Sequence, residues 1–261
     1  MSKKKLVGII AGCIIAVIVV VVVAGFNFPG RLAFGLVYQA DFSSVEPGTE
    51  TQVMQAAKGV IQKRIAATNV SDSTVQVQEH EGEYRIVIQV PGTVDIEQVK
   101  DVVELSAVLE FREQDAQGNC IPAAGIVDGE NLTLTSEYFG QNTYVAVSQN
   151  GQPILVFQWG ATGAQLSKQI TTRLLGKPIA IFSDGEPLRT PDGQIIAPIV
   201  QAVIEDKGQI EGLSLTDASR LRDLLNAGQI PVPLGRWVEE GQSRVFEPNV
   251  PLYEGPVTEL P

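Results

Sequence analysis

Apolar residues recur at two different spacings between residues 31 and 113, and these spacings predict alternating strands and helices. Alternation with a period of two indicates strands, whereas recurrence every three or four residues indicates helices. The predicted strands cover 32–42, 75–91 (as a hairpin) and 107–113, and the predicted helices cover 49–69 and 95–106. The order β-α-β-β-α-β is typical of a ferredoxin-like fold, in which two helices cover one face of a four-stranded antiparallel sheet.

The first predicted helix has one apolar stripe and several basic residues. The stripe, at offsets of three and four, consists of Val53, Ala56, Ala57, Val60, Ile61 and Ile65. Such a stripe packs against a core. Lys58, Lys63 and Arg64 lie mostly off the stripe, so we expect them on a solvated face and not in an anion site.

The pattern changes after residue 113, where turn residues become frequent. Residues 114–135 are rich in Gly, Asn, Asp and Pro and predict a loop or linker. Further strands are predicted at 144–147, 154–158 and 178–182, with a helix at 162–175. Pro198 interrupts the apolar stretch 195–204, which favours an edge strand or a bend there.

The stretch DLLNAGQIPVPL, at 223–234, combines a helix end with an extended segment. Thr216 is the predicted N-cap of the helix, and Gly228 stands where a left-handed residue is wanted after it. Pro231 and Pro233 favour an extended backbone before them. We therefore expect a strand over 230–234, at a sheet margin or beside a partner.

Residues 1–26 begin with three lysines followed by an apolar run. Residues 6–24 contain no charge and no proline, and roughly 28 Å of helix would cross a bilayer. We expect an uncleaved single-pass anchor with a cytoplasmic N-terminus, which puts the remainder on the extracytoplasmic side. Two alternatives remain open, namely a signal peptide cut after Ala24 and a lipoprotein acylated at Cys13.

Composition and charge limit the classes of function. The chain of 261 residues is 44% hydrophobic and 19% charged, which is typical of a globular protein. The first 26 residues hold three of the 19 basic residues and none of the 30 acidic ones, so the remainder has a net charge of −14. So acidic a surface repels nucleic acid. Cys13 and Cys120 lie on opposite sides of the predicted membrane boundary, so no disulfide is expected.

Residues that could carry chemistry are few. His80 falls in a predicted hairpin turn, and Asp184-Gly185 and Asp192-Gly193 have turn chemistry without EF-hand spacing. Other candidates are Asp95, Glu97, Asp101 and Glu104, expected on a solvated helix face, and Trp159 and Trp237, expected in the core. We predict no catalytic, cofactor-binding or metal-binding residue and no enzyme. An extracytoplasmic enzyme would need a polar cleft with perturbed carboxylates.

Four segments of the sequence form a recognisable series, namely QKRIAATNVSDSTVQVQEHEGEYRIVIQVPG, AVLEFRE, GKPIAIFSDG with IIAPIV, and TDASRLRDLLNAGQIPVPL. In this order they resemble the first extracytoplasmic domain of the protein-export membrane protein SecD. The resemblance implies an α+β fold with a ferredoxin-like base and an inserted head. The expected divisions are 1–26 lysines and anchor, 31–113 base, 114–212 linker and head, 213–240 helix and strand completing the base, and 241–261 an acidic proline-rich tail.

The resemblance implies an accessory of Sec-dependent protein export that binds or guides translocating polypeptides. Its expected partners are Sec translocase subunits, SecD/SecF-type membrane proteins, unfolded exported chains, and lipid through the anchor. Two departures stand out. Only the tail of the family's Gly-Leu-Asp-Leu-x-Gly-Gly stretch is recognisable, in FGLVYQADF, and no second apolar span appears. We therefore expect no proton-conducting helices in this sequence. The alternative is a membrane-anchored interaction or envelope-structural module with no export role.

Overall fold

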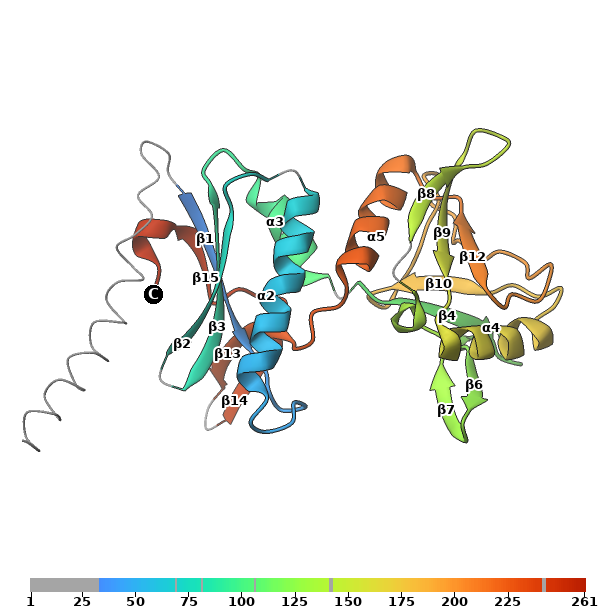
Figure 1. The fold of residues 1–261 in the computed structure, drawn as a ribbon, viewed down its shortest axis with the longest axis horizontal. Coiled ribbons are helices and arrows are strands. Elements are labelled where there is room, and N and C mark those ends of the chain that lie inside the picture. Colours follow the sequence, from blue (N-terminus) through green and yellow to red (C-terminus); the bar gives the residue numbers. More distant parts are fainter. Residues whose placement is uncertain (1–32, 69, 81, 106, 141–142, 241–242) are drawn as a thin grey trace, which may run out of the picture.

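The computed structural model of the protein describes residues 33–261, apart from 69, 81, 106, 141–142 and 241–242. Figure 1 shows them in two lobes, and each lobe has its own buried core. The anchor predicted at residues 1–26 lies outside the described residues. Among the helices that the structure describes, none has both the length and the apolar character that a bilayer crossing requires.

The first lobe is one antiparallel sheet with two helices on one face (Figure 1). Its strands follow the order β14-β13-β1-β3-β2, and β15 also pairs with β1. The elements are β1 (Ala33–Ala40), α2 (Glu50–Ala67), β2 (Thr74–His80), β3 (Glu83–Pro91), α3 (Ile96–Glu104), β13 (Leu234–Glu240), β14 (Ser243–Pro248) and β15 (Tyr253–Pro256). The predicted first strand, hairpin and two helices are confirmed. Leu36 and Tyr38 alternate along β1 and share one core with Ile61 and Val99 of the helices.

The described part of the second lobe contains three small sheets, one α-helix and one short 3-10 helix. Its elements are β4 (Leu109–Gln114), β5 (Cys120–Pro122), β6 (Ala124–Val127), β7 (Glu130–Thr133), η1 (Ser136–Tyr138), β8 (Tyr144–Val147), β9 (Pro153–Gln158), α4 (Ala161–Arg173), β10 (Ala180–Ser183), β11 (Glu186–Pro187) and β12 (Lys207–Glu211). The sheet orders are β11-β10-β4-β5, β12-β9-β8 and β6-β7. Four aromatic rings contact one another in its core, from Phe111, Phe139, Phe157 and Trp159.

The strand predicted at 107–113 exists, but its expected place in the first sheet is wrong. As β4 it pairs with β10 and β5, and its residues Leu109 and Phe111 belong to the second core. The position beside β1 is taken by β13, through the pairs Gln39–Gly235 and Ala40–Leu234. Alternation identifies a strand and its apolar face but leaves the choice of partner strand to the rest of the fold.

Residues 114–135 are not a plain linker, because they contain the short strands β5, β6 and β7. Ala123, Val127 and Leu134 are buried in the second core. Asp128 and Gly129 join β6 to β7 with φ angles of 54° and 87°. Two such residues form the tight turn that suits a hairpin. These strands are so short that turn residues dominate the composition of 114–135, and this composition predicted a loop or linker.

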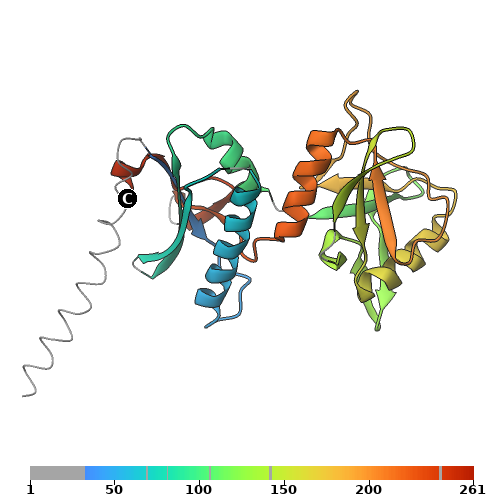
Figure 2. The ribbon, with the colours of Figure 1, turned by 45° about the horizontal axis from the view of Figure 1, so that its top comes forward.

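Helix α5 (Leu215–Ala227) stands between the lobes (Figure 2). Leu224 lies in the first core, whereas Ala218 and Leu221 lie in the second. The predicted cap at Thr216 is wrong. Ser214 caps the helix, since its Oγ accepts a hydrogen bond from the backbone N–H of Asp217 at 3.0 Å. Gly228 ends it with a φ of 93°, as expected from sequence.

One predicted strand begins later than expected, and the stretch predicted as an edge strand or a bend contains no strand. The strand expected at 230–234 begins only at Leu234, where β13 starts. Prolines at 231 and 233 lack the N–H that a ladder needs. The stretch 195–204 likewise contains no assigned strand and makes only isolated bridges, such as Pro178 with Ile199. Residues 231 and 232 form a bend, and 195–204 agrees with the bend that was the predicted alternative to an edge strand.

Two strands within the expected tail, 241–261, pair with the first sheet. β14 extends the sheet beyond β13, and β15 pairs with β1 from Phe34 to Val37. The final turn η2 (Val257–Glu259) follows β15 and precedes Leu260, which lies against Gly35. A Cβ added at Gly35 would lie 2.8 Å from Cδ2 of Leu260, so a larger residue there would have to displace the Leu260 side chain.

Candidate functional site at the junction of the two lobes

The polar candidates singled out in the sequence do not form one site. His80 is exposed at the end of β2, and Asp184 and Asp192 are exposed in turns. The four acids at α3 contact four different partners. Asp95 accepts a hydrogen bond from the backbone N–H of Glu97, and Glu97 forms an ion pair with Lys100. Asp101 forms an ion pair with Arg220, and Glu104 accepts a hydrogen bond from the Tyr38 hydroxyl. Glu104 is half-buried and not solvated as expected. Among the described residues, no group of His, Cys, Asp and Glu is arranged to hold a metal ion.

The two tryptophans have different surroundings. Trp159 is buried in the second core, as predicted. Trp237 is half-buried on β13 and outside both cores, so the core prediction is wrong for it. Its ring packs beside Phe246 with 5.1 Å between centroids, and the Arg244 guanidinium lies 5.5 Å from the Trp237 ring centre. Trp237 therefore braces β13 against β14.

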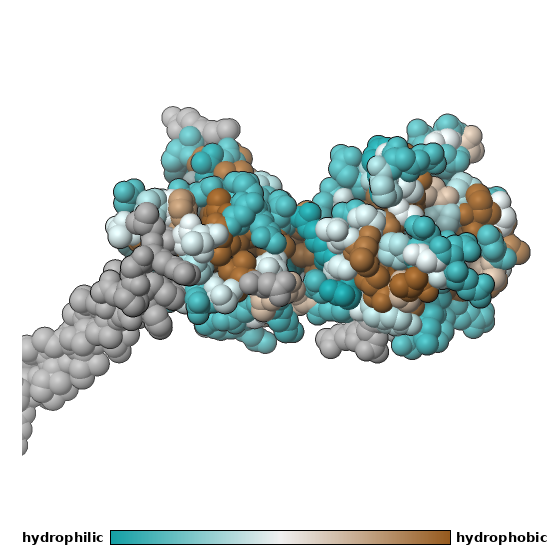
Figure 3. Space-filling model, turned by 90° about the horizontal axis from the view of Figure 1, so that it is seen from above, coloured by the Kyte–Doolittle hydropathy of each residue, from teal (hydrophilic) through white to brown (hydrophobic). Residues whose placement is uncertain are grey.

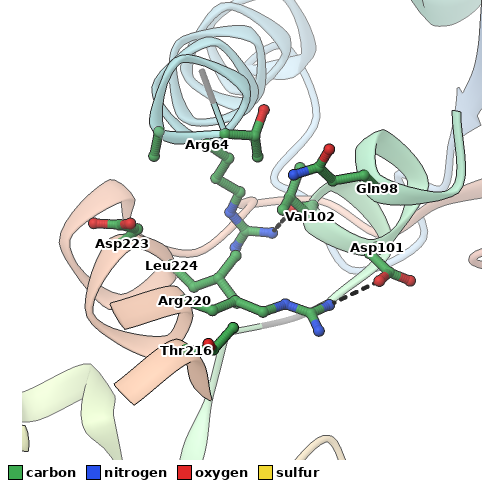
Figure 4. Close-up of a pocket in the computed structure, with 10 residues that line it drawn as sticks. Arg64, Gln98, Asp101, Val102, Thr216, Arg220, Asp223 and Leu224 are labelled. Carbon is green, nitrogen blue, oxygen red and sulfur yellow. Dashed lines mark hydrogen bonds and ion pairs between the residues drawn. The ribbon is translucent and has the colours of Figure 1, made fainter. Parts of the chain in front are cut away.

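A cavity of about 290 Å³ lies at the junction of the lobes, between α2, α3 and α5. Its polar lining residues include Arg64, Thr68, Gln98, Asp101, Arg220 and Asp223 (Figure 4). The lining contains two arginines and two aspartates, so its formal charges cancel and leave no surplus charge for an ionic ligand. A second hollow of about 330 Å³ also borders α5, with Leu105, Leu188 and Leu221 in its lining. Both cavities border α5, so the packing between the two cores is interrupted at this junction.

Arg64 of α2 is buried in this junction, with 1% of its surface exposed. Its Nη1 donates to the carbonyl oxygens of Val102 at 3.0 Å and Leu105 at 2.5 Å, and its Nη2 donates to the carbonyl oxygen of Gly228 at 2.9 Å. Burial lowers the pKa of Arg64 to about 10, so the guanidinium stays charged at neutral pH. The carbonyls lie at the ends of α3 and α5, where helix dipoles favour a positive charge.

The expectation that Arg64 is solvated is therefore wrong. The buried residues of α2 are Met54, Ala57, Ile61, Arg64 and Ile65. Arg64 stands three residues after Ile61 and seven after Ala57, so its spacing places it on the buried face. Helical spacing could have identified it, but a basic side chain in such a stripe is buried only where partners exist. Those partners come from distant parts of the chain.

A second arginine, Arg220 of α5, forms an ion pair with Asp101 of α3 at 3.2 Å. Figure 4 shows this pair beside the cavity, with Arg64 reaching toward Val102 from the other side. The side chains of Arg220 and Asp101 are 43% and 58% exposed. Exposed ion pairs contribute about 0–1 kcal/mol, so this contact holds the lobes far less firmly than Arg64 does.

Exposed apolar side chains occur on the second lobe. Of the described strands, only β9 pairs with β8, whose Tyr144 and Val147 are 49% and 70% exposed. Leu175, Ile199 and Val203 are also exposed. The backbone N–H of Gly176 donates to the carbonyl of Val200, which holds the segments of Leu175 and Ile199 together. Figure 3 shows apolar surface among hydrophilic groups on this lobe.

Two models of known protein families match this chain. One model, described as the N-terminal part of the P1 domain of protein translocase subunit SecDF, matches residues 54–116. A second, described as the SecDF P1 head subdomain, matches residues 107–232. The chain belongs to the SecD/SecDF family over this P1 region. The predicted resemblance is thereby confirmed, and 107–232 corresponds to the second lobe with α5.

Curated relatives agree with the family models. SecD of Dehalococcoides mccartyi (strain VS) is 40% identical over 235 residues, which cover 86% of this chain and 51% of that protein. SecD of Sebaldella termitidis is 28% identical over 228 residues, which cover 84% of this chain and 51% of that protein. The chain spans about half the length of these curated relatives.

Solved structures show the same mixed α+β fold. The chain resembles a crystal structure of SecDF in a super-membrane-facing form with a TM-score of 0.56 and 22% identity, covering 89% of this chain and 34% of that one. It also resembles a structure of SecDF, titled a membrane component that enhances protein export, with a TM-score of 0.55 and 25% identity. This match covers 77% of this chain and 96% of that one.

Proposed function

We propose that this chain is a SecD-like accessory of Sec-dependent protein export, whose extracytoplasmic lobes bind or guide translocating polypeptides. The proposal is carried by the 40% identity to a SecD protein across 235 residues. Its partners would be Sec translocase subunits and SecD/SecF-type membrane proteins. Residues 1–26 would anchor the chain in the cell membrane through one span, with the N-terminus cytoplasmic.

The first lobe serves as a ferredoxin-like base in this proposal. The order β13-β1-β3-β2, with two helices on one face, supports this description. The second lobe is the inserted head. Residues 27–261 contain no second apolar stretch of spanning length, and proton coupling needs ionisable groups inside the membrane. We therefore place the proton-conducting helices outside these residues.

The polypeptide surface in this proposal is the edge of β8 that no other described strand occupies, with the exposed side chains of β8. An edge strand offers backbone N–H and C=O groups to an extended chain, whatever the sequence of that chain. Tyr144 and Val147 add apolar contact at the same strand. This mode suits a protein that meets many different exported chains, because backbone pairing requires no particular side chains.

Site-specific photocrosslinking in cells tests the proposal. The crosslinker is placed at Tyr144 and Val147 of β8, which are exposed, and not at Trp159 or Phe182, which are buried. Gln62, an exposed residue of α2 on the first lobe, is the matched control position. We expect a stalled secretory polypeptide to be captured from Tyr144 and Val147 and not from Gln62. Capture of only an unrelated envelope protein, with normal secretion after deletion, would replace the export role by that of an envelope interaction module.

A further inference from the structure

The chain crosses between the lobes twice, and both crossings lie close together. The first is 105–108, between the end of α3 and the start of β4. The second is 228–233, between the end of α5 and the start of β13. Each crossing begins where a helix ends and leaves its last carbonyl groups without intrahelical partners.

One guanidinium holds both crossings. The Arg64 side chain donates to Leu105 at the start of the first crossing and to Gly228 at the start of the second. A third bond, to Val102, ties it to the last turn of α3. Hydrogen bonds from a charged donor are stronger than neutral ones, and burial shields these from water. A flexible ammonium could not span the same set of acceptors, because only the guanidinium has a planar fork of donors.

The end of α5 also forms hydrogen bonds to the second lobe. Asn226 donates from Nδ2 to the carbonyl of Thr143 at 2.8 Å, and its Oδ1 accepts from the N–H of Thr143 at 3.2 Å. Thr143 directly precedes β8 in the second lobe. Two residues later, Gly228 is held by Arg64 of the first lobe. The helix end is thus fixed to both lobes within three residues.

We infer that Arg64 couples the two crossings, so that they open together and the angle between the lobes depends on this one side chain. Loss of the Arg64 bonds frees the ends of α3 and α5 from α2, while Asn226 keeps α5 on the second lobe. The cavity of about 290 Å³ beside Arg64 leaves α5 room to move against α2 and α3. This inference holds whether or not the chain takes part in export.

Hydrogen exchange on the full-length chain tests the coupling, with Arg64→Lys and Arg64→Met compared with the native protein. The reporters are the amides at the end of α3 and the amide of Gly228, which donates to Leu224 at 3.1 Å. We expect both sets to exchange about ten- to a hundredfold faster, because charged hydrogen bonds are lost. Arg220→Gln, at the exposed arginine of the same junction, should leave both unchanged.

The amides of central strand β3 report opening of the whole first lobe. Faster exchange at both crossings than at β3 supports the inference. If the amide exchange rate rises at only one crossing, or rises equally at β3, the inference is overturned and Arg64 has a purely structural role.

A second measurement reads the angle between the lobes directly. Spin labels at Gln62 and Gln165, exposed on α2 and α4, are introduced with Cys13→Ser and Cys120→Ser. The distance distribution should broaden in Arg64→Met and stay narrow in Arg220→Gln, and an unchanged distribution in Arg64→Met would also overturn the inference.

Discussion

The two lobes differ in the side chains of the edge strands β2 and β8. In the first lobe, six strands form one sheet, and the edge strand β2 turns Val75 into the core while Gln76 and Gln78 alternate with it. In the second lobe, the sheets have four, three and two strands, and the edge strand β8 exposes Tyr144 and Val147. A polar edge discourages pairing with another chain, whereas an apolar open edge favours it. The proposed binding surface therefore lies on the second lobe, at β8.

Substitution of Phe157 by Ala should have the largest effect and tests whether the lobes are separate in energy. The Phe157 ring stacks on Phe139 at 4.1 Å and contacts Phe111 and Trp159, so its removal leaves a cavity. We expect a loss of about 3–5 kcal/mol in the free energy of unfolding of the second lobe. Urea unfolding followed by hydrogen exchange at β3 and β9 measures it. An equal loss of protection in both lobes would contradict two independent cores.

Gly35→Val tests how the C-terminal segment is held on the first lobe. The valine side chain would displace Leu260, and overpacking of this kind costs about 1–3 kcal/mol. We expect a lower melting temperature and faster proteolysis after residue 250. The matched control is Gly59→Ala in α2, where an added Cβ meets no atom within 4 Å, and alanine there should stabilise the helix by about 0.5–1 kcal/mol. Unchanged proteolysis in Gly35→Val would show that Leu260 does not secure the segment.

Glu104→Gln should change how stability depends on pH. Burial raises the pKa of Glu104 above its ordinary value, although the Tyr38 hydroxyl and Lys100 oppose the shift. The folded state therefore binds the proton more tightly than the unfolded state, and this contribution to stability is lost as pH rises through the folded pKa. Glutamine keeps an acceptor for Tyr38 without the charge. We expect the variant to melt higher than the native protein near pH 7, with the difference shrinking as the pH falls through the raised folded pKa and levelling off below the unfolded value of about 4.3.

Thermal unfolding of the Glu104→Gln protein across that pH range measures the effect. If the difference in melting temperature grows as the pH falls, folding lowers the pKa of Glu104 and does not raise it. Glu97→Gln on the same helix serves as the control, because Glu97 is exposed.

Arg220→Gln should have the smallest effect. Its partner Asp101 is exposed, so we expect a loss of less than about 1 kcal/mol that disappears in high salt. Denaturant unfolding at two salt concentrations measures this. A large loss independent of salt would mean that the ion pair, and not Arg64, dominates the junction.

Sequence patterns located most elements of the first lobe but fewer of its pairings. The helices α2 and α3 and the hairpin β2–β3 were predictable because their apolar spacing is a local property. The family resemblance also indicated a head between residues 114 and 212. The short strands β5, β6 and β7 were missed, since three or four residues give too little alternation to detect against their turns.

The sequence by itself determined where apolar faces occur, where the helix before Gly228 ends, and the acidity of residues 27–261. Only the tertiary structure decided that β4 joins β10, that β13 and β15 share one edge of β1, and that Arg64 is buried. The physical reason is the same in each case. Side-chain periodicity is fixed by neighbours in the chain, whereas strand partners and the carbonyl groups around a buried guanidinium come from segments up to 164 residues away.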